Sequence, residues 1–411
     1  MTVNPQQQDH PPTRAILAFL TIVAGTTLGL AGIDLVLPSV PFMPQIFGTT
    51  QATAQMVLAA YVAGSTVGLL LFGSLASHFG RRRLFIASLA AFALVSLASA
   101  LVDDIWALIG LRLLQGAAAS GSAVLAPGLI RGLFSELGAV RAIGAMGSIE
   151  ALVPGLAPIA GAWLHKAYGW QMSFNLTGIL CLAICLLVFV VPSLLPHIGR
   201  KQGDAPSSYL KVVANPTFLR YGLSHALILG ALLTFVFSAP AVIIQTMGGT
   251  IEDFILMQFI GVSCFIVSAN LAGNLVKRWG AETVITAGTC LSLLGTLLLL
   301  GYALFGVNDP MHLSALFWVL NTGLGIRGGA GFVRALTASH GDDERASAII
   351  ILATTGIAAV GTALVAPFIL MGLTALTIMV VAIIFPAVIL ILAIKPLEDN
   401  GEEQAPVIGQ E

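Results

Sequence analysis

The stretch Gly73-Ser-Leu-Ala-Ser-His-Phe-Gly-Arg-Arg-Arg83 separates two long apolar segments, residues 52–76 and 83–101. A helix needs about 20 apolar residues to cross a hydrocarbon core roughly 30 Å thick, and both segments are close to that length. Arginines collect in short loops on the cytoplasmic side of a membrane. The stretch therefore predicts a helical hairpin in a membrane, with its turn in the cytoplasm.

The same alternation continues along the whole chain. Of the 411 residues, 57% are hydrophobic and 9% are charged, and the mean hydropathy is +0.96, which is outside the usual range of soluble domains. We expect an all-α membrane protein with twelve transmembrane helices. They are predicted at residues 15–37, 52–76, 83–101, 105–128, 141–164, 173–195, 218–244, 254–276, 283–305, 312–335, 346–370 and 373–394.

The basic residues predict the orientation. If the N-terminus is cytoplasmic, fifteen of the 18 Lys and Arg residues fall on the cytoplasmic side. They are Arg14, Arg81, Arg82, Arg83, Arg131, Arg141, Arg200, Lys201, Lys211, Arg220, Lys277, Arg278, Arg334, Arg345 and Lys395. Only Lys166 falls outside, while Arg112 and Arg327 lie within predicted spans. Both termini are therefore predicted to be cytoplasmic.

The two halves of the chain resemble each other. A shift of 200 residues places Gly48 on Gly248, Gly73 on Gly273 and Gly80 on Gly280, and a shift of 204 places Arg141 on Arg345. Two parallel six-helix repeats are a known layout of transporters. We expect bundles at residues 15–195 and 218–395, a cytoplasmic linker at 196–217, and cytoplasmic tails at 1–14 and 396–411.

Several classes of protein are disfavoured by what the sequence lacks. It has no Cys-x-x-Cys, no His-Glu-x-x-His and no Gly-Lys dipeptide, so neither a metal site nor a P-loop is predicted. No nucleophile–base pair or cofactor motif is seen, so we predict no cofactor and no enzymatic activity. The net charge of −1 gives no reason to expect a nucleic-acid partner. Uphill transport by this chain would depend on an ion gradient or on a partner protein.

The stretch 73–83 resembles the loop motif of the major facilitator superfamily, Gly-x-Leu-Ala-Asp-Arg-x-Gly-Arg-Arg. Gly73 and Gly80 permit close backbone approach, and Arg81 and Arg82 can face acidic partners in one gating state. Here Ser77 and His78 stand where the motif usually has Asp and Arg. The charge interaction that the motif Asp usually makes is therefore in question. The alternative is a basic loop that sets orientation and has no role in gating.

Two further stretches resemble motifs of the same superfamily. Leu111-Arg-Leu-Leu-Gln-Gly116 places Arg112, Gln115 and Gly116 within a span, where a charge is costly and usually faces a cavity. The stretch 146–161 resembles the antiporter motif, whose prolines permit bending and whose glycines permit close packing. Its members here are Pro154, Gly155, Pro158 and Gly161. The alternatives are an arginine that reaches the membrane surface and a kinked helix without an exchange function.

Gly32-Ile-Asp-Leu-Val-Leu-Pro-Ser-Val-Pro41 resembles the Asp-x-Tyr-Leu-Pro-x-x-Pro signature of the Bcr/CflA drug-resistance carriers, with Val36 in place of the aromatic residue. Asp34 and Arg112 lie at similar depths, so contact between them is possible. Glu150 is an additional carboxylate that the antiporter motif does not require. We predict that Asp34, Arg112 and Glu150 couple transport to protons.

Other polar residues also fall inside predicted spans. His225 and Arg327 are candidate substrate-binding residues together with Asp34 and Glu150, and Arg327 is also a candidate counter-ion for Glu150. A lone His on an apolar helix is more often a packing residue. Asp342-Asp-Glu344 beside Arg345 is interpreted as a solvated loop with local pairing.

The resemblance implies a proton-coupled exporter of small amphipathic compounds, such as antibiotics, that works as a monomer in a bacterial-type inner membrane. Its partners would be a small-molecule substrate, protons and the lipid bilayer. Two alternatives stay open: an exporter of one native metabolite that carries drugs incidentally, and a membrane sensor on the same fold that does not transport.

Overall fold

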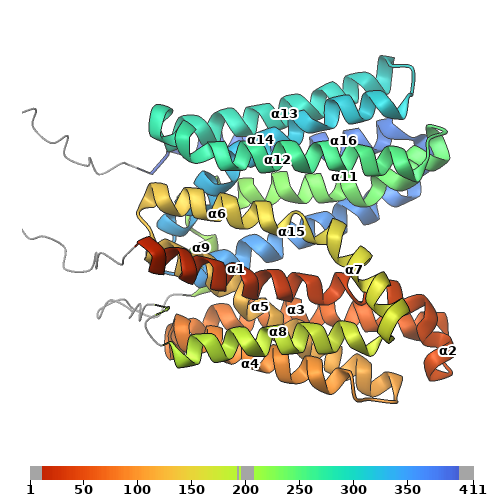
Figure 1. The fold of residues 1–411 in the computed structure, drawn as a ribbon. Coiled ribbons are helices and arrows are strands. Elements are labelled where there is room, and N and C mark those ends of the chain that lie inside the picture. Colours follow the sequence, from red (N-terminus) through yellow and green to blue (C-terminus); the bar gives the residue numbers. More distant parts are fainter. Residues whose placement is uncertain (1–11, 192–193, 196–207, 398–411) are drawn as a thin grey trace, which may run out of the picture.

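The computed structural model describes residues 12–191, 194–195 and 208–397. All regular structure in these ranges is helical, as expected (Figure 1). Most of both predicted tails and residues 196–207 of the predicted linker lie outside the described residues.

By their order in the chain, the long helices form an N-terminal and a C-terminal group. The N-terminal group contains α1 (Pro12–Asp34), α3 (Gln51–Phe79), α4 (Arg81–Ser99), α5 (Ile105–Leu133), α6 (Glu136–Glu150), α7 (Val153–Tyr168) and α8 (Gln171–Val190). The C-terminal group contains α11 (Ser224–Thr246), α12 (Ile251–Trp279), α13 (Ala281–Phe305), α14 (Pro310–Ala338), α15 (Asp343–Val365) and α16 (Leu373–Ala393). Short elements connect them: η1 (Leu37–Phe42), α2 (Met43–Phe47), α9 (Tyr209–Val213), α10 (Pro216–Phe218), the π-helical turn η2 (Leu219–Leu223) and η3 (Ala366–Met371).

Eleven helical stretches of the described chain are long and apolar enough to cross a membrane. The segment predicted at residues 312–335 is α14, which has 29 residues and is therefore about 43 Å long. Arg327, Arg334 and a run of glycines lower its hydropathy, and it is not among these eleven stretches. This composition suits a helix whose surface is covered mainly by other helices.

Glycines at matching positions of the two groups support the repeat predicted from the sequence. Gly48 and Gly248 have φ angles of 61° and 67°, and Gly80 and Gly280 have φ angles of 82° and 81°. Residues with a Cβ rarely adopt such angles. Gly80 thus connects α3 to α4 without a longer loop, and Gly280 does the same between α12 and α13.

Two helix ends differ from the predicted spans. The predicted span 141–164 is divided between α6 and α7, because Pro154 in the first turn of α7 cannot continue the backbone ladder of α6. Helix α1 ends at Asp34, and the proline-containing η1 follows. Asp34 and Glu150 are consequently the last residues of their helices.

The two groups meet mainly through α6, which packs on α12 and α14, and through α15, which packs on α3 and α5. We call the end of the molecule at which α9, the start of α1 and the end of α16 lie the linker end (Figure 1). Near this end, a Cβ added at Gly144 would lie 2.8 Å from the carbonyl oxygen of Ala269 in the other group. Small residues thus allow the backbones of the two groups to approach closely.

Candidate functional site

Arg112 is buried completely in the N-terminal group. Its Nε donates to the Val57 carbonyl at 3.1 Å, and its Nη1 donates to the Gly32 carbonyl at 2.9 Å and to Gln115 Oε1 at 2.6 Å. The guanidinium also lies 4.3 Å from the ring centroid of Tyr61. These contacts join α1, α3 and α5 around one buried charge.

The close approach of α3 and α5 makes this arrangement possible. A Cβ added at Gly116 would collide with the carbonyl oxygen of Tyr61 on α3, so the predicted Gln-Gly pair is used for packing. Gln115 in turn donates to Ser96 Oγ at 2.6 Å. The polar atoms of this site are therefore positioned by backbone contact and by neighbouring side chains.

Asp34 is half-buried at the end of α1. Within the described residues no ion pair joins it to Arg112, whose Nε and Nη1 donate to carbonyl and amide oxygens. The Tyr61 hydroxyl donates to the Gly29 carbonyl of α1, so this tyrosine lies between the helix that carries Asp34 and the arginine. The structure thus places the two predicted coupling residues on neighbouring helices without direct pairing.

Glu150 ends α6 at the break in the predicted antiporter motif. Its carboxylate is half-buried and lies near the side chain of Thr26 on α1. In α7, a Cβ added at Gly161 would collide with the carbonyl oxygen of Leu35, whereas Gly155 has no neighbour within 4 Å. Of these two glycines, only Gly161 is needed for close packing on the chain that follows α1.

Within the described residues no ion pair joins Arg327 to Glu150, and Arg327 bonds to the start of α11. Its Nη1 donates to the Ser224 carbonyl at 3.2 Å, and its Nη2 donates to Ser224 Oγ at 2.9 Å and to the Tyr221 carbonyl at 3.5 Å. The π-helical turn before α11 directs these groups toward α14. His225 is buried beside this site, and its ring and that of Phe332 pack in a T-shaped arrangement.

The acidic segment at the start of α15 is a site that the sequence interpretation missed. Asp343 accepts from Arg81 Nη2 at 3.1 Å and from Arg131 Nη1 at 2.6 Å, and Glu344 pairs with Arg81 Nε. The side chains of Asp343 and Glu344 are 5% and 7% exposed, so the prediction of a solvated loop is wrong. We call Arg81, Arg131, Asp343 and Glu344 the ion-pair cluster. It connects the two helix groups.

A second set of polar contacts joins the groups at the linker end. Arg334 of α14 lies 3.4 Å from Glu136 at the start of α6, and Arg141 Nη2 donates to Asn274 Oδ1 at 3.0 Å. The hydrogen bonds and ion pairs seen between the groups lie in the half of the described molecule nearer the linker end. The groups are therefore fastened at one end.

The remaining loop-motif residues also lie at this end. Arg82 Nη2 donates to the Val188 carbonyl near the end of α8 at 3.4 Å, where a cation stabilises the last carbonyls of a helix. Gly73 faces Ala348 and Glu344 of α15. The Ser77 side chain lies outside what the structure describes. The predicted motif thus coincides with the seam between the groups.

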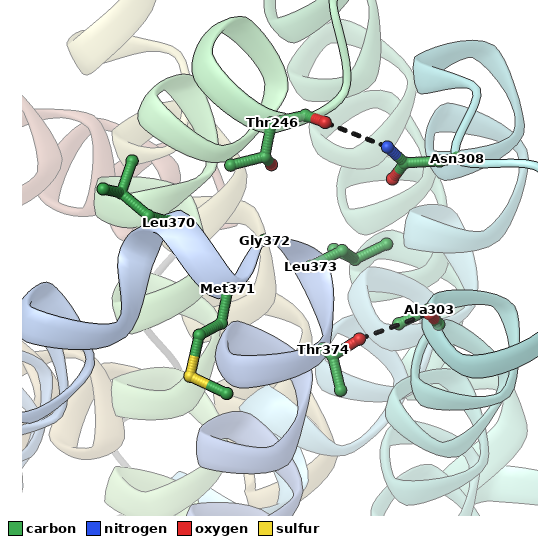
Figure 2. Close-up of a pocket in the computed structure, with 8 residues that line it drawn as sticks. All are labelled: Thr246, Ala303, Asn308, Leu370, Met371, Gly372, Leu373 and Thr374. Carbon is green, nitrogen blue, oxygen red and sulfur yellow. Dashed lines mark hydrogen bonds between the residues drawn. The ribbon is translucent and has the colours of Figure 1, made fainter.

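Figure 2 shows a pocket at the opposite end of the C-terminal group. Its volume is about 200 Å³, which is below the range of about 300–1,000 Å³ for sites of drug-sized ligands. Asn308 donates to the Thr246 carbonyl at 3.0 Å and Thr374 to the Ala303 carbonyl at 3.2 Å. This pocket contains none of the predicted site residues, and its polar groups tie helix connections together.

Comparisons with known proteins agree with this architecture. The model of the Major Facilitator Superfamily matches residues 17–364. A chloramphenicol resistance protein from Pseudomonas aeruginosa is 28% identical over 299 residues, covering 72% of this chain and 71% of the relative. A bicyclomycin resistance protein homolog from Haemophilus influenzae is 24% identical over 296 residues, covering 70% and 74%. These relatives are consistent with the resemblance to the Bcr/CflA carriers.

Two solved structures share the fold. The transporter FucP in the outward conformation superposes with a TM-score of 0.70 at 16% identity, over 92% of this chain and 99% of that chain. The proton:xylose symporter XylE superposes with a TM-score of 0.69 at 15% identity, over 94% and 97%. At these identities the likeness establishes the fold alone.

Proposed function

Because the chain belongs to the Major Facilitator Superfamily, we propose that it is a proton-coupled transporter that exports small amphipathic compounds by alternating access. Two relatives are named as resistance proteins for chloramphenicol and bicyclomycin, which supports drugs as substrates. Both alternatives, a dedicated metabolite exporter and a sensor without turnover, predict different outcomes in the experiment below.

The proposed topology has twelve crossings, with α14 as the tenth, in bundles at residues 15–195 and 218–395. The linker end is assigned to the cytoplasm because many arginines lie there. They are those of the loop motif and, in addition, Arg131, Arg141 and Arg334. Fastening at this end corresponds to a state closed toward the cytoplasm. A single chain contains both helix groups and the interface between them, so one monomer in the inner membrane can form the whole transport pathway.

The observation that carries proton coupling is the state of the two intramembrane carboxylates. Within the described chain, neither Asp34 nor Glu150 has a cationic partner, although both are partly withdrawn from solvent. A charged carboxylate without a partner is costly to hold inside a membrane protein, and binding a proton removes that cost. We propose that both carboxylates gain and lose protons as access alternates, with Arg112 organising the helices around Asp34.

The energy of one proton is sufficient for this function. Moving one charge through 100 mV releases about 2.3 kcal/mol. Since about 1.4 kcal/mol corresponds to a tenfold ratio, one proton per neutral substrate supports a gradient of about fiftyfold. In the present state Arg327 and His225 are buried, so their proposed contact with substrate belongs to another state of the cycle.

The test is uptake of radiolabelled chloramphenicol into inside-out proteoliposomes with an imposed pH gradient. We expect Asp34→Asn and Arg112→Ala to lose gradient-driven uptake, while Asp103→Asn, at an exposed loop position, retains it. Size-exclusion profiles of the purified variants control for misfolding. Gradient-driven uptake at the wild-type rate in Asp34→Asn would refute its coupling role.

Counterflow without a gradient separates the alternatives. A sensor that does not transport shows no counterflow of chloramphenicol in the wild-type protein. A dedicated metabolite exporter shows counterflow with that metabolite and little with chemically unrelated drugs, because strict hydrogen-bonding sites reject analogues strongly. Counterflow with several unrelated amphipathic drugs supports the proposal.

A further inference from the structure

Tyr209 of the linker helix α9 is inserted between the two helix groups. Its hydroxyl donates to the carbonyl of Leu70 on α3 at 2.6 Å. Gly73, one turn further along α3, leaves room for this contact, because an added Cβ there would collide with the Tyr209 hydroxyl. The glycine that opens the loop motif thus accommodates a side chain from the linker.

The Tyr209 side chain reaches both groups, because its hydroxyl bonds to Leu70 of α3 and its ring lies near the Arg345 guanidinium of α15. It packs on an apolar cluster formed by Leu69 of α3, Val124 of α5 and Ala348 of α15. Desolvation raises the pKa of the Tyr209 phenol above its ordinary value, so the hydroxyl keeps its proton and remains a donor. The Tyr209 side chain therefore connects a backbone carbonyl of the N-terminal group with the interface formed by α15 of the C-terminal group.

The equivalent position in the other half is filled differently. Gly273 corresponds to Gly73, and a Cβ added at Gly273 would collide with the Arg141 side chain. Arg345 corresponds to Arg141, yet its guanidinium lies 5.7 Å from the ring centroid of Tyr209 and bonds to Asp342 at 3.0 Å. Tyr209 thus occupies the place that the repeat would give to an arginine, and it breaks the symmetry between the two seams.

We propose that Tyr209 is a latch: a positioning residue of the linker that favours the state in which the linker end is closed. When the groups separate at this end, α15 moves away from α3, and Tyr209 cannot keep its contacts on both sides. The loop motif here lacks its usual Asp, and the latch supplies an uncharged closing contact next to Gly73. This role requires no particular substrate, so it can be tested separately from the proposed transport activity.

The reporter is a cysteine placed on the other seam, Ser148→Cys, in a chain without native cysteines. Ser148 accepts a hydrogen bond from Asn270 across the groups and is 6% exposed, so alkylation there requires the groups to separate. We expect Tyr209→Phe to raise the alkylation rate about fivefold, as for one net hydrogen bond. Tyr209→Ala, which also empties the ring site, is expected to raise it roughly tenfold or more.

The pair Gly73 and Tyr209 gives a sharper test. Gly73→Ala is expected to accelerate alkylation strongly in the wild-type background and only slightly in Tyr209→Phe. The reason is that the nearest atom left beside the new methyl group is then Ala348 Cβ, at 3.2 Å. The matched control is Gly273→Ala, whose collision is with Arg141, so Tyr209→Phe must not rescue it.

Unfolding is monitored by a parallel protein whose only cysteine is Cys181, which is buried within the N-terminal group. We expect the alkylation rate of Cys181 to be the same in the protein with Tyr209 and in the Tyr209→Phe variant. The latch is refuted if Tyr209→Phe leaves the alkylation rate of the Ser148→Cys reporter unchanged, if it accelerates Cys181 equally, or if the effects of Gly73→Ala and Tyr209→Phe are additive.

Discussion

Replacing Asp343 by Asn is predicted to open the linker end. The Asp343 carboxylate is 5% exposed and binds two arginines of the other helix group, Arg81 and Arg131. Breaking a buried ion pair by removing one charge costs about 3–5 kcal/mol. We take the lower limit, about 3 kcal/mol, because the Arg131 side chain is 29% exposed and remains partly hydrated.

A loss of about 3 kcal/mol corresponds to a change of about a hundredfold in the ratio of closed to open molecules. The assay is the alkylation rate of the Ser148→Cys reporter, which is proportional to the open population when closing is fast. We expect Asp343→Asn to raise this rate by up to about a hundredfold. The seam in question lies between α3, α5 and α15, away from the reporter on α6.

The matched control is Glu282→Gln. Glu282 pairs with Arg220 at 2.9 Å at the same end, but both residues belong to elements of the C-terminal half. We expect this variant to lower thermal stability without raising the alkylation rate. The reasoning fails if Asp343→Asn is alkylated at the wild-type rate, or if Glu282→Gln accelerates alkylation to the same extent.

Three further predictions concern the interior. Gly161→Ala is expected to lower the melting temperature in detergent because its Cβ collides with the Leu35 carbonyl. Gly155→Ala has no neighbour within 4 Å and is expected to leave the melting temperature unchanged or to raise it. Equal effects of the two variants would contradict the packing role of Gly161. Arg327→Met is expected to destabilise the protein by about 1–3 kcal/mol, since Tyr221 and Ser224 lose a buried donor. Arg327→Lys is expected to restore little because it lacks the planar fork, and full stability of Arg327→Met in thermal unfolding would oppose this. Glu150→Gln is expected to flatten the pH dependence of chloramphenicol uptake, because an amide cannot exchange the proton, and an unchanged pH profile would make Glu150 structural.

Much of the fold was predictable because its determinants are local. Apolar segments of membrane length, the arginines beside Gly80 and the repeated glycines each act within a few residues. The all-helical fold and the superfamily were confirmed. The number and grouping of the spans, the orientation and the roles of Asp34, Arg112 and Glu150 stay predictions.

The candidate site was only partly predictable because burial depends on distant residues. Asp342-Asp-Glu344 looks like an ordinary polar turn in the sequence, since its partners Arg81 and Arg131 lie more than 200 residues away. The sequence did not indicate a role for Tyr209, because its contact with α3 depends on the space beside Gly73 in the folded structure. Arg131 and Arg334 correspond at a shift of 203 residues, and this match was a usable hint. Both arginines bind acidic residues that begin a helix of the other group.

The sequence by itself determined that this chain is a multi-pass helical membrane protein, because the length and hydrophobicity of its apolar segments are properties of the covalent chain. Only the tertiary structure decided which end of the molecule is fastened and by which residues. Ion pairs and glycine contacts across the seam exist in one arrangement of the two groups and are lost in another, so no linear pattern encodes them.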